Sequence, residues 1–208
     1  MFVKCMAYPS DVHVLAWRLD EEAPRLLALC SDAGIPVTDL VDLPVKRLRE
    51  RAAERLLLCR AFGLRVTLEH DGQGVPFVAG SDVNISISHT RRLVVLAWHE
   101  REIIGIDAEQ TDRRQVLRVR DKFLNDKEKC FILPDDLAAH VIAWTAKEAV
   151  IKAERNSAID WTDGICLSPF STSDHLTILE ACCADRCYRL TCRQVEDHYI
   201  TVATPVAK

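Results

Sequence analysis

The chain has 208 residues, of which 49% are hydrophobic and 28% charged, with a formal net charge of −4. This composition is typical of a folded globular protein, and it gives no reason to expect nucleic acid or an anionic membrane as a partner. No apolar run approaches the ~20 residues of a membrane helix, and the first residues lack the core of a signal peptide. The nine cysteines include no CxxC pair. We therefore expect a cytoplasmic protein with reduced thiols.

Hydrophobic periodicity in the first half predicts helices followed by hairpin-connected strands. Pro44 and Gly63 are typical of the two ends of one strong helix. The Asp71-Gly72 turn predicts a β-hairpin. In chain order we expect a strand at 13–19, helices at 21–33 and 45–62, strands at 66–70, 75–78, 83–88 and 93–98, and a further strand at 103–109.

The second half repeats this rhythm loosely. We expect a basic helical segment at 113–132 that is broken near Asn125, a helix at 137–154, and strands at 165–167, 176–182, 187–196 and 198–203. Helices combined with mostly hairpin-connected strands predict an α+β fold. The expected division is an N-terminal half at 1–100 and a C-terminal half at 101–208, which carries the acidic motifs described next.

Two carboxylates follow an apolar run in REIIGIDAEQT, residues 101–111. Asp107 and Glu109 are two residues apart, so on a strand both leave the same face. Like charges on one face repel and are costly to desolvate. They are either solvated at a turn or share a cation.

The helix segment WTAKEAVIKAE, residues 144–154, places an acid and bases on one face. Glu148 and Lys152 could form a surface pair worth ~0.3–0.5 kcal/mol. The alternative is that Glu148 joins Asp107 and Glu109 around a hard divalent cation. Mg²⁺ prefers such oxygen ligands and completes its shell with water and substrate phosphates.

The third motif is ISISHT, residues 85–90. Ser86 and Ser88 point to one side of the expected strand, and His89 stands at its end beside Arg91 and Arg92. Hydroxyls, an imidazole and guanidinium groups together suit an anionic ligand such as phosphate. The alternative is a solvated polar turn.

These three motifs, in this order, resemble those of the 4′-phosphopantetheinyl transferase family, in its Sfp-like class. That family has a Ser-His segment, then Gly-(Ile/Val)-Asp-x-Glu, then Trp-x-x-Lys-Glu-x-x-x-Lys. The chain has Ser88-His89, Gly105-Ile106-Asp107-Ala108-Glu109 and the segment from Trp144 to Lys152. The segments RDKFLNDKEKCF and KRLRERAAERLLLCRAFG are also similar to family segments, so the resemblance runs from about residue 46 to 152.

The resemblance implies two similar α+β halves in a pseudo-twofold arrangement, with the active site in the cleft between them. It implies a holo-[acyl-carrier-protein] synthase, or 4′-phosphopantetheinyl transferase, that moves the phosphopantetheine group of coenzyme A to a serine of an acyl or peptidyl carrier protein and releases 3′,5′-ADP. A chain with both halves needs no second copy, so we expect a monomer. The rival interpretation is a non-catalytic module that binds coenzyme A or a carrier protein.

By the same resemblance, Asp107, Glu109 and Glu148 would hold Mg²⁺. Glu148 would also be the base for the serine proton, and Lys152 would be a catalytic cation on the diphosphate of coenzyme A. Glu128 would be a supporting acid near the metal.

The coenzyme A contacts implied by the family are Ser88, His89 and Lys152, with Arg47 and Arg55 as candidates for the 3′-phosphate. Pro76 belongs to the turn that contacts coenzyme A. The family turn usually reads Gly-Lys-Pro, whereas this chain has Val75 before Pro76. The missing lysine contact would cost ~1.5–3 kcal/mol, and Arg91 and Arg92 are the candidates to replace it.

Overall fold

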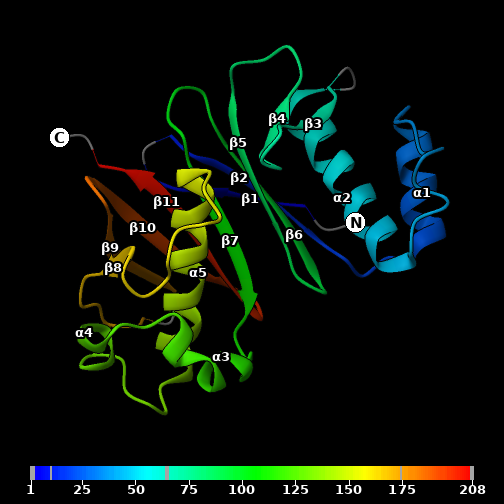
Figure 1. The fold of residues 1–208 in the computed structure, drawn as a ribbon. Coiled ribbons are helices and arrows are strands. Elements are labelled where there is room, and N and C mark those ends of the chain that lie inside the picture. The colour runs from blue at the N-terminus through cyan, green and yellow to red at the C-terminus, as the bar shows by residue number, and fades with distance from the viewer. Residues whose placement is uncertain (1–2, 10, 64–65, 174, 207–208) are drawn as a thin grey trace.

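The computed structural model describes residues 3–9, 11–63, 66–173 and 175–206. Two antiparallel sheets form its centre (Figure 1). The N-terminal sheet has the strand order β1-β2-β6-β5, and the helices α1 and α2 cover its outer face. Its elements are β1 (Val3–Ala7), β2 (His13–Arg18), α1 (Ala23–Asp32), α2 (Val45–Phe62), β5 (Asn84–His89) and β6 (Leu93–His99), and the hairpin β3 (Leu68–His70) and β4 (Pro76–Val78) lies beside them.

The C-terminal sheet has the order β7-β11-β10-β9-β8, and the long helix α5 packs on one of its faces. Short helical turns fill the chain between β7 and α5. The elements are β7 (Gly105–Gln110), α3 (Gln115–Arg118), the 3₁₀ turn η1 (Arg120–Lys122), α4 (Asp126–Lys129), α5 (Leu137–Glu154), β8 (Ile165–Leu167), β9 (Leu176–Cys183), β10 (Arg186–Val195) and β11 (His198–Pro205).

Strand alternation divides the apolar residues between three cores. In β6, Val94 and Leu96 face α1 and α2, whereas Val95 faces the second sheet. In β7, Ile106 joins Val95 in this central core between the sheets. A third core lies between α5 and the C-terminal sheet. The protein is therefore layered as helices, sheet, sheet and helix, which confirms the predicted mixture of helices with hairpin-connected strands.

The two long helices begin and end where the sequence predicts. Pro44 is the N-cap of α2, and Gly63 ends it with φ of 92°, a backbone conformation that favours glycine. The Asp136 side chain caps α5 by accepting from the Ala139 N–H, and Arg155 ends it with φ of 54°. These local signals position both helices on their sheets.

Most predicted elements appear within a few residues of their expected bounds. The prediction for 113–132 is wrong in extent, because this segment forms only α3, η1 and α4 instead of a long helix. Its break at Asn125 is confirmed: Asn125 is the N-cap of α4, and it forms a capping box with Glu128. Strand β1 lies in a region for which no element was predicted.

Both sheets follow one topological rule. A first strand (β2 or β7) precedes the long helix, and the last strand of the half (β6 or β11) returns to pair with it, followed by the penultimate strand (β5 or β10). Among the described helices, none is long and apolar enough to cross a membrane.

Candidate functional site

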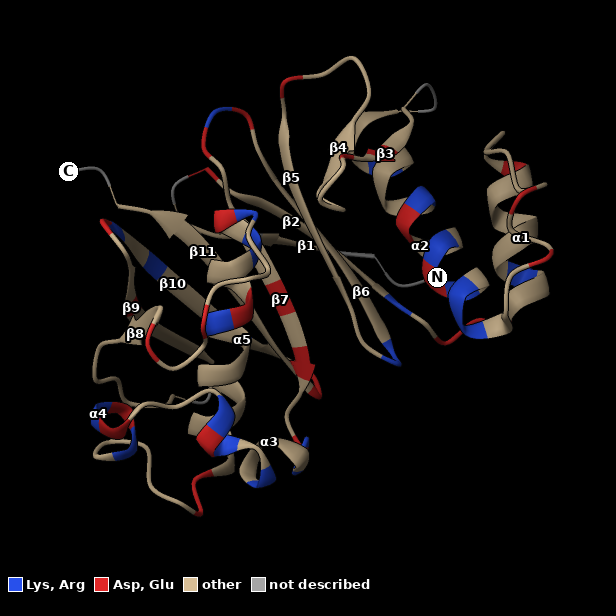
Figure 2. Ribbon diagram, viewed as in Figure 1, with Lys and Arg blue, Asp and Glu red and all other residues tan. Residues whose placement is uncertain are grey.

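The acidic motif lies on β7, with its carboxylates on the α5 side. Ile106 and Ala108 fill the central core between the sheets, so the alternating positions Asp107 and Glu109 face the opposite way. Figure 2 shows these acidic bands of β7 beside the charged turns of α5. The prediction that both carboxylates share a face is confirmed.

Gly105 sets how closely α5 approaches β7. A Cβ at this position would overlap the carbonyl oxygen of Ala149 and lie 2.7 Å from the backbone nitrogen of Ala153. Only glycine therefore lets the helix backbone rest directly on the strand. This close approach brings the side chains of α5 next to the acids of β7.

Asp107 is held from both halves of the chain. Its Oδ1 accepts a hydrogen bond from the Ser88 hydroxyl at 2.7 Å and another from Lys152 Nζ at 2.8 Å. Lys152 also donates to the Ile106 carbonyl oxygen at 2.9 Å. Among the described residues, Lys152 therefore forms its ion pair with Asp107 and not with Glu148.

The serines of ISIS join the two sheets at β5 and β7. Ser86 Oγ accepts from the Ile106 N–H at 3.0 Å, and Ser88 Oγ accepts from the Ala108 N–H at 3.4 Å. Side-chain hydroxyls thus replace a backbone ladder at this junction. The prediction that both serines point one way is confirmed, and Ser88, which is buried, binds protein atoms.

Glu148 interacts electrostatically with Asp107. Burial is the main reason that its pKa is raised, the negative charge of Asp107 adds to this, and Lys152 and Arg113 oppose it. Arg113 forms an ion pair with Glu109 and stacks over the Trp144 ring, 5.3 Å from the centroid.

Asp107, Glu109 and Glu148 therefore share one neighbourhood with two cations. Within the described part of the chain, no group of three His, Cys, Asp or Glu side chains has the spacing of a metal site. Lys152 pairs with Asp107 and Arg113 pairs with Glu109, whereas no hydrogen bond or ion pair is found at the Glu148 carboxylate among the described residues.

A cleft of about 760 Å³ opens beside Lys152, which is the one of these five residues that lines it. The turn at Val75 and Pro76 and strand β5 line one part of it, and the last turns of α5, including Lys152, line another. The cleft thus lies between the two halves, and it brings Pro76 and Lys152 to a common space.

The two predicted arginines of the basic helix α2 have different partners. Glu50, which is buried, pairs with Arg47 at 3.1 Å and lies 3.8 Å from His89 Nδ1, so both side chains lie next to one carboxylate. Arg55 lies apart from them, because its guanidinium is bonded to both carboxylate oxygens of Asp39. Figure 2 shows charges of both signs along α2.

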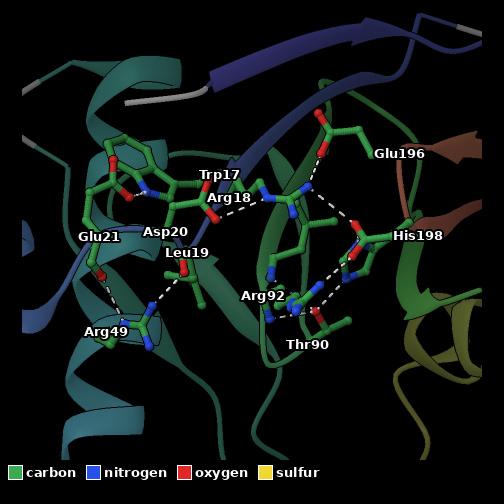
Figure 3. A network of polar contacts seen from close by, with 12 residues as sticks. Trp17, Arg18, Leu19, Asp20, Glu21, Arg49, Thr90, Arg92, Glu196 and His198 are labelled. Carbon is green, nitrogen blue, oxygen red and sulfur yellow. Dashed lines mark hydrogen bonds and ion pairs between the residues drawn. The ribbon is translucent and has the colours of Figure 1, made fainter. Parts of the chain in front are cut away.

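A second junction joins the halves through His198 (Figure 3). Its Nε2 lies 2.9 Å from Thr90 Oγ1, and its Nδ1 lies 2.9 Å from Asp197 Oδ1. Arg92 Nη1 donates to Asp197 Oδ2 at 3.1 Å, and Arg18 pairs with Asp197 at 3.4 Å. The candidate replacement of the missing lysine contact by Arg92 therefore finds no support, because Arg92 pairs with Asp197.

The expectation that Glu128 supports a metal is wrong. Glu128 is buried, and its Oε2 accepts from Lys147 Nζ at 2.7 Å and from the Asn125 N–H at 2.9 Å. Its Oε1 accepts from the Leu167 N–H at 2.8 Å. Both oxygens thus bind structural groups, away from the acids of β7.

Arg113 was not predicted as a site residue, and the partner of Ser86 was not predicted. Arg113 follows Glu109 by four residues, but the strand ends between them, so helical spacing gave no signal. Ser86 was visible in the ISIS alternation, but its bond to the Ile106 N–H depends on β7 lying alongside.

Comparison with known proteins gives one family. The family model of the 4′-phosphopantetheinyl transferase superfamily matches residues 103–203, which span β7 to most of β11. No curated protein matches the chain. The matched segment contains Asp107, Glu109, Glu148 and Lys152. Residues 103–203 are a domain of the 4′-phosphopantetheinyl transferase superfamily, a transferase domain, and the resemblance read from the motifs is confirmed.

Proposed function

We propose that the chain is an Mg²⁺-dependent 4′-phosphopantetheinyl transferase of the Sfp-like class. It would transfer the phosphopantetheine group of coenzyme A to a serine of an acyl or peptidyl carrier protein and release 3′,5′-ADP. One observation carries the proposal: Lys152, which lines the 760 Å³ cleft, is bonded to Asp107, whose charge acts on Glu148.

The chemistry of the three carboxylates suits a hard cation, although they do not have the spacing of a metal site in the described structure. No bond is found at Asp107 Oδ2 or at either oxygen of Glu148 within the described residues, and carboxylate oxygens are the ligands that Mg²⁺ prefers. Asp107, Glu148 and Glu109 would hold the ion once Lys152 and Arg113 turn toward the phosphates. A bound Mg²⁺ would neutralise charge that develops on the diphosphate.

In the proposed reaction, side chains of the protein carry out the proton transfer and stabilise the leaving group. Glu148 accepts the proton of the carrier serine, directly or through water, as that hydroxyl attacks the β-phosphate. Lys152 donates hydrogen bonds to phosphate oxygens and stabilises the leaving 3′,5′-ADP. Ser88 keeps Asp107 in position through its 2.7 Å hydrogen bond.

Coenzyme A would lie along the cleft with its phosphates toward β5. Pro76 is the best-placed contact, because it lines the cleft. His89 and Arg47, which both lie near Glu50, are candidates that rest on the family resemblance. Ser88 is a further candidate. Arg55 has the least support, since Asp39 already holds its guanidinium.

The shared topological rule of the sheets supports a pseudo-twofold relation between halves 1–100 and 101–208. In each half a long helix, α2 or α5, packs on the sheet of that half. A single chain then supplies both walls of the cleft, so we expect an active monomer, and we expect it in the cytoplasm.

An assay with apo carrier protein, coenzyme A and Mg²⁺ tests the function. The mass of the carrier should rise by one phosphopantetheine group. Glu148→Gln should lower kcat by ~10²–10⁴-fold, because it keeps the shape but removes the base. The matched control is Glu180→Gln, which changes an exposed acid on β9.

The alternative is a binding module without activity. Calorimetry would then show coenzyme A binding, while several apo carriers keep their mass. Full activity of Glu148→Gln would overturn the assignment of the base.

A further inference from the structure

Three cysteines form a row across the outer strands of the C-terminal sheet. Cys182 on β9 lies directly opposite Cys187 on β10 and Cys166 on β8. All three are exposed free thiols. Because exposed and buried positions alternate along β9, the adjacent Cys183 points into the core beneath α5, so the row lies on the other face of the sheet.

The β9–β10 hairpin brings two of these thiols together. The strands are joined by a two-residue loop that begins at Ala184, whose φ is 49°. In such a hairpin the pair next to the loop, Cys183 and Arg186, is hydrogen-bonded, and the following pair is not. Cys182 and Cys187 are that following pair.

Non-hydrogen-bonded pairs bring side chains closest. Their Cα atoms lie ~4.5 Å apart, which is within the ~4.4–6.8 Å that a disulfide spans. The Sγ atoms of Cys182 and Cys187 lie 2.7 Å apart. A bond between them therefore needs no movement of the backbone.

We propose that Cys182 and Cys187 are a reversible thiol–disulfide pair, oxidised by exchange with a small-molecule disulfide. The Cys187 thiolate attacks one sulfur of the reagent, forming a mixed disulfide, and the released half takes up the proton that Cys187 lost. The Cys182 thiolate then attacks the Cys187 sulfur, and the second half leaves with the proton of Cys182. Two protein thiols are oxidised and one small disulfide is reduced to two thiols.

The two thiols affect each other's ionisation. Their hydrogen bond, followed by burial, raises the pKa of Cys182 to about 11. The thiolate is the nucleophile in both steps, and the products are the same if the two thiols exchange roles.

The buried cysteines lack access and Cys5 lacks a partner, whereas Cys166 is exposed opposite Cys182 and is distinguished from Cys187 by the variants below. Burial raises the pKa of Cys30 to about 11 and that of Cys192 to about 12. Cys5 is exposed on β1, but the residue opposite it is Leu15. Cys5 can therefore form a mixed disulfide but no cross-strand bond, and it provides the matched control.

The proposed bond closes only a short hairpin. A short loop removes less entropy from the unfolded chain than a long loop does. Oxidation should therefore raise the urea midpoint, but by less than a disulfide that closes a long loop would. The pair lies on the sheet face away from α5, so the inference stands whether or not the proposed transfer is correct.

The test treats the full chain with oxidised glutathione, blocks free thiols by alkylation and digests it with trypsin. Cleavage after Arg186 and Arg189 separates the tripeptide of Cys187 from the peptide that contains Cys182. We expect the two peptides to be linked in the wild type and in Cys5→Ser and Cys166→Ser, and to separate with dithiothreitol. In Cys182→Ser the tripeptide should carry glutathione instead.

Two results would overturn the proposal. The first is a wild-type tripeptide that is only alkylated or glutathionylated. The second is a link that persists in Cys182→Ser, which would assign the bond to Cys183 or Cys166. Circular dichroism of Cys182→Ser checks that this variant is folded. Cys182→Ala is a second variant for the same test if Cys182→Ser does not fold.

Discussion

Two lysines of α5 pair with carboxylates at nearly the same distance but in opposite surroundings. Lys147 Nζ lies 2.7 Å from Glu128 and its side chain is fully buried, whereas Lys152 Nζ lies 2.8 Å from Asp107 and its side chain is 28% exposed. Lys147 also donates to the carbonyl oxygens of Trp161 and Ile165. All three of its donors are thus used within the fold.

Lys152 has two fixed acceptors, Asp107 and the Ile106 carbonyl oxygen, and it lines the cleft. One proton remains for a ligand in that cleft. The contrast teaches that an ion pair with all its hydrogen bonds made inside the protein stabilises the fold, while an incompletely bonded pair at a cleft is available for chemistry.

Of the changes considered, removal of Lys147 should lower the free energy of unfolding most. Burial lowers the pKa of Lys147, and Glu128 opposes this, so each charge depends on the other. Lys147→Met should lower the free energy of unfolding by ~3–5 kcal/mol, because it leaves the Glu128 carboxylate buried and unpaired. Urea unfolding measures this loss. A loss below ~1 kcal/mol would mean that the pair does not stabilise the fold.

Gly105→Ala should have the next largest effect. The added Cβ meets the backbone of α5 at Ala149, so helix and strand must separate. We expect a loss of ~1–3 kcal/mol in unfolding free energy, together with weaker transfer. The control is Gly72→Ala, where a Cβ meets no atom within 4 Å. Equal stability of the two variants would contradict the close packing.

Acid should weaken the junction at His198, with a smaller effect. Burial lowers the pKa of His198 below 6.5, and the charges of Arg18 and Arg92 lower it further, whereas Asp197 raises it. Thr90 Oγ1 forms a hydrogen bond with Nε2 of His198. Between the lowered value and ~6.5 the unfolded chain binds more protons, so stability falls as the pH falls through this window.

The variant His198→Gln isolates this effect. Unfolding free energies measured between about pH 7.5 and about pH 5 should fall less steeply for the variant than for the wild type. Parallel curves would show that another group causes the acid sensitivity.

Lys152→Met should have the smallest effect on the free energy of unfolding, in contrast to Lys147→Met. A partly exposed pair contributes less than ~1 kcal/mol. The same variant should lower kcat for transfer, because the cation at the cleft is lost. A stability loss as large as that of Lys147→Met would remove the distinction between the two pairs.

Local patterns predicted much of the fold. The bounds of α2 and α5 follow from Pro44, Gly63 and a continuous helical period, which depend only on nearby residues. The prediction of a helical segment at 113–132 was wrong in extent because the basic composition suits a helix, whereas the segment packs against α5 as short turns.

Motif order was enough to predict the family, and strand alternation was enough to predict that Asp107 and Glu109 share a face, because both are properties of the sequence. The ion-pair partners could be identified only in the tertiary structure: Lys152 with Asp107, Glu128 with Lys147, and Arg55 with Asp39. Sequence spacing fixes the direction in which a side chain leaves its own element. It cannot fix which charge from a distant element arrives there, because that depends on how the two sheets and α5 pack.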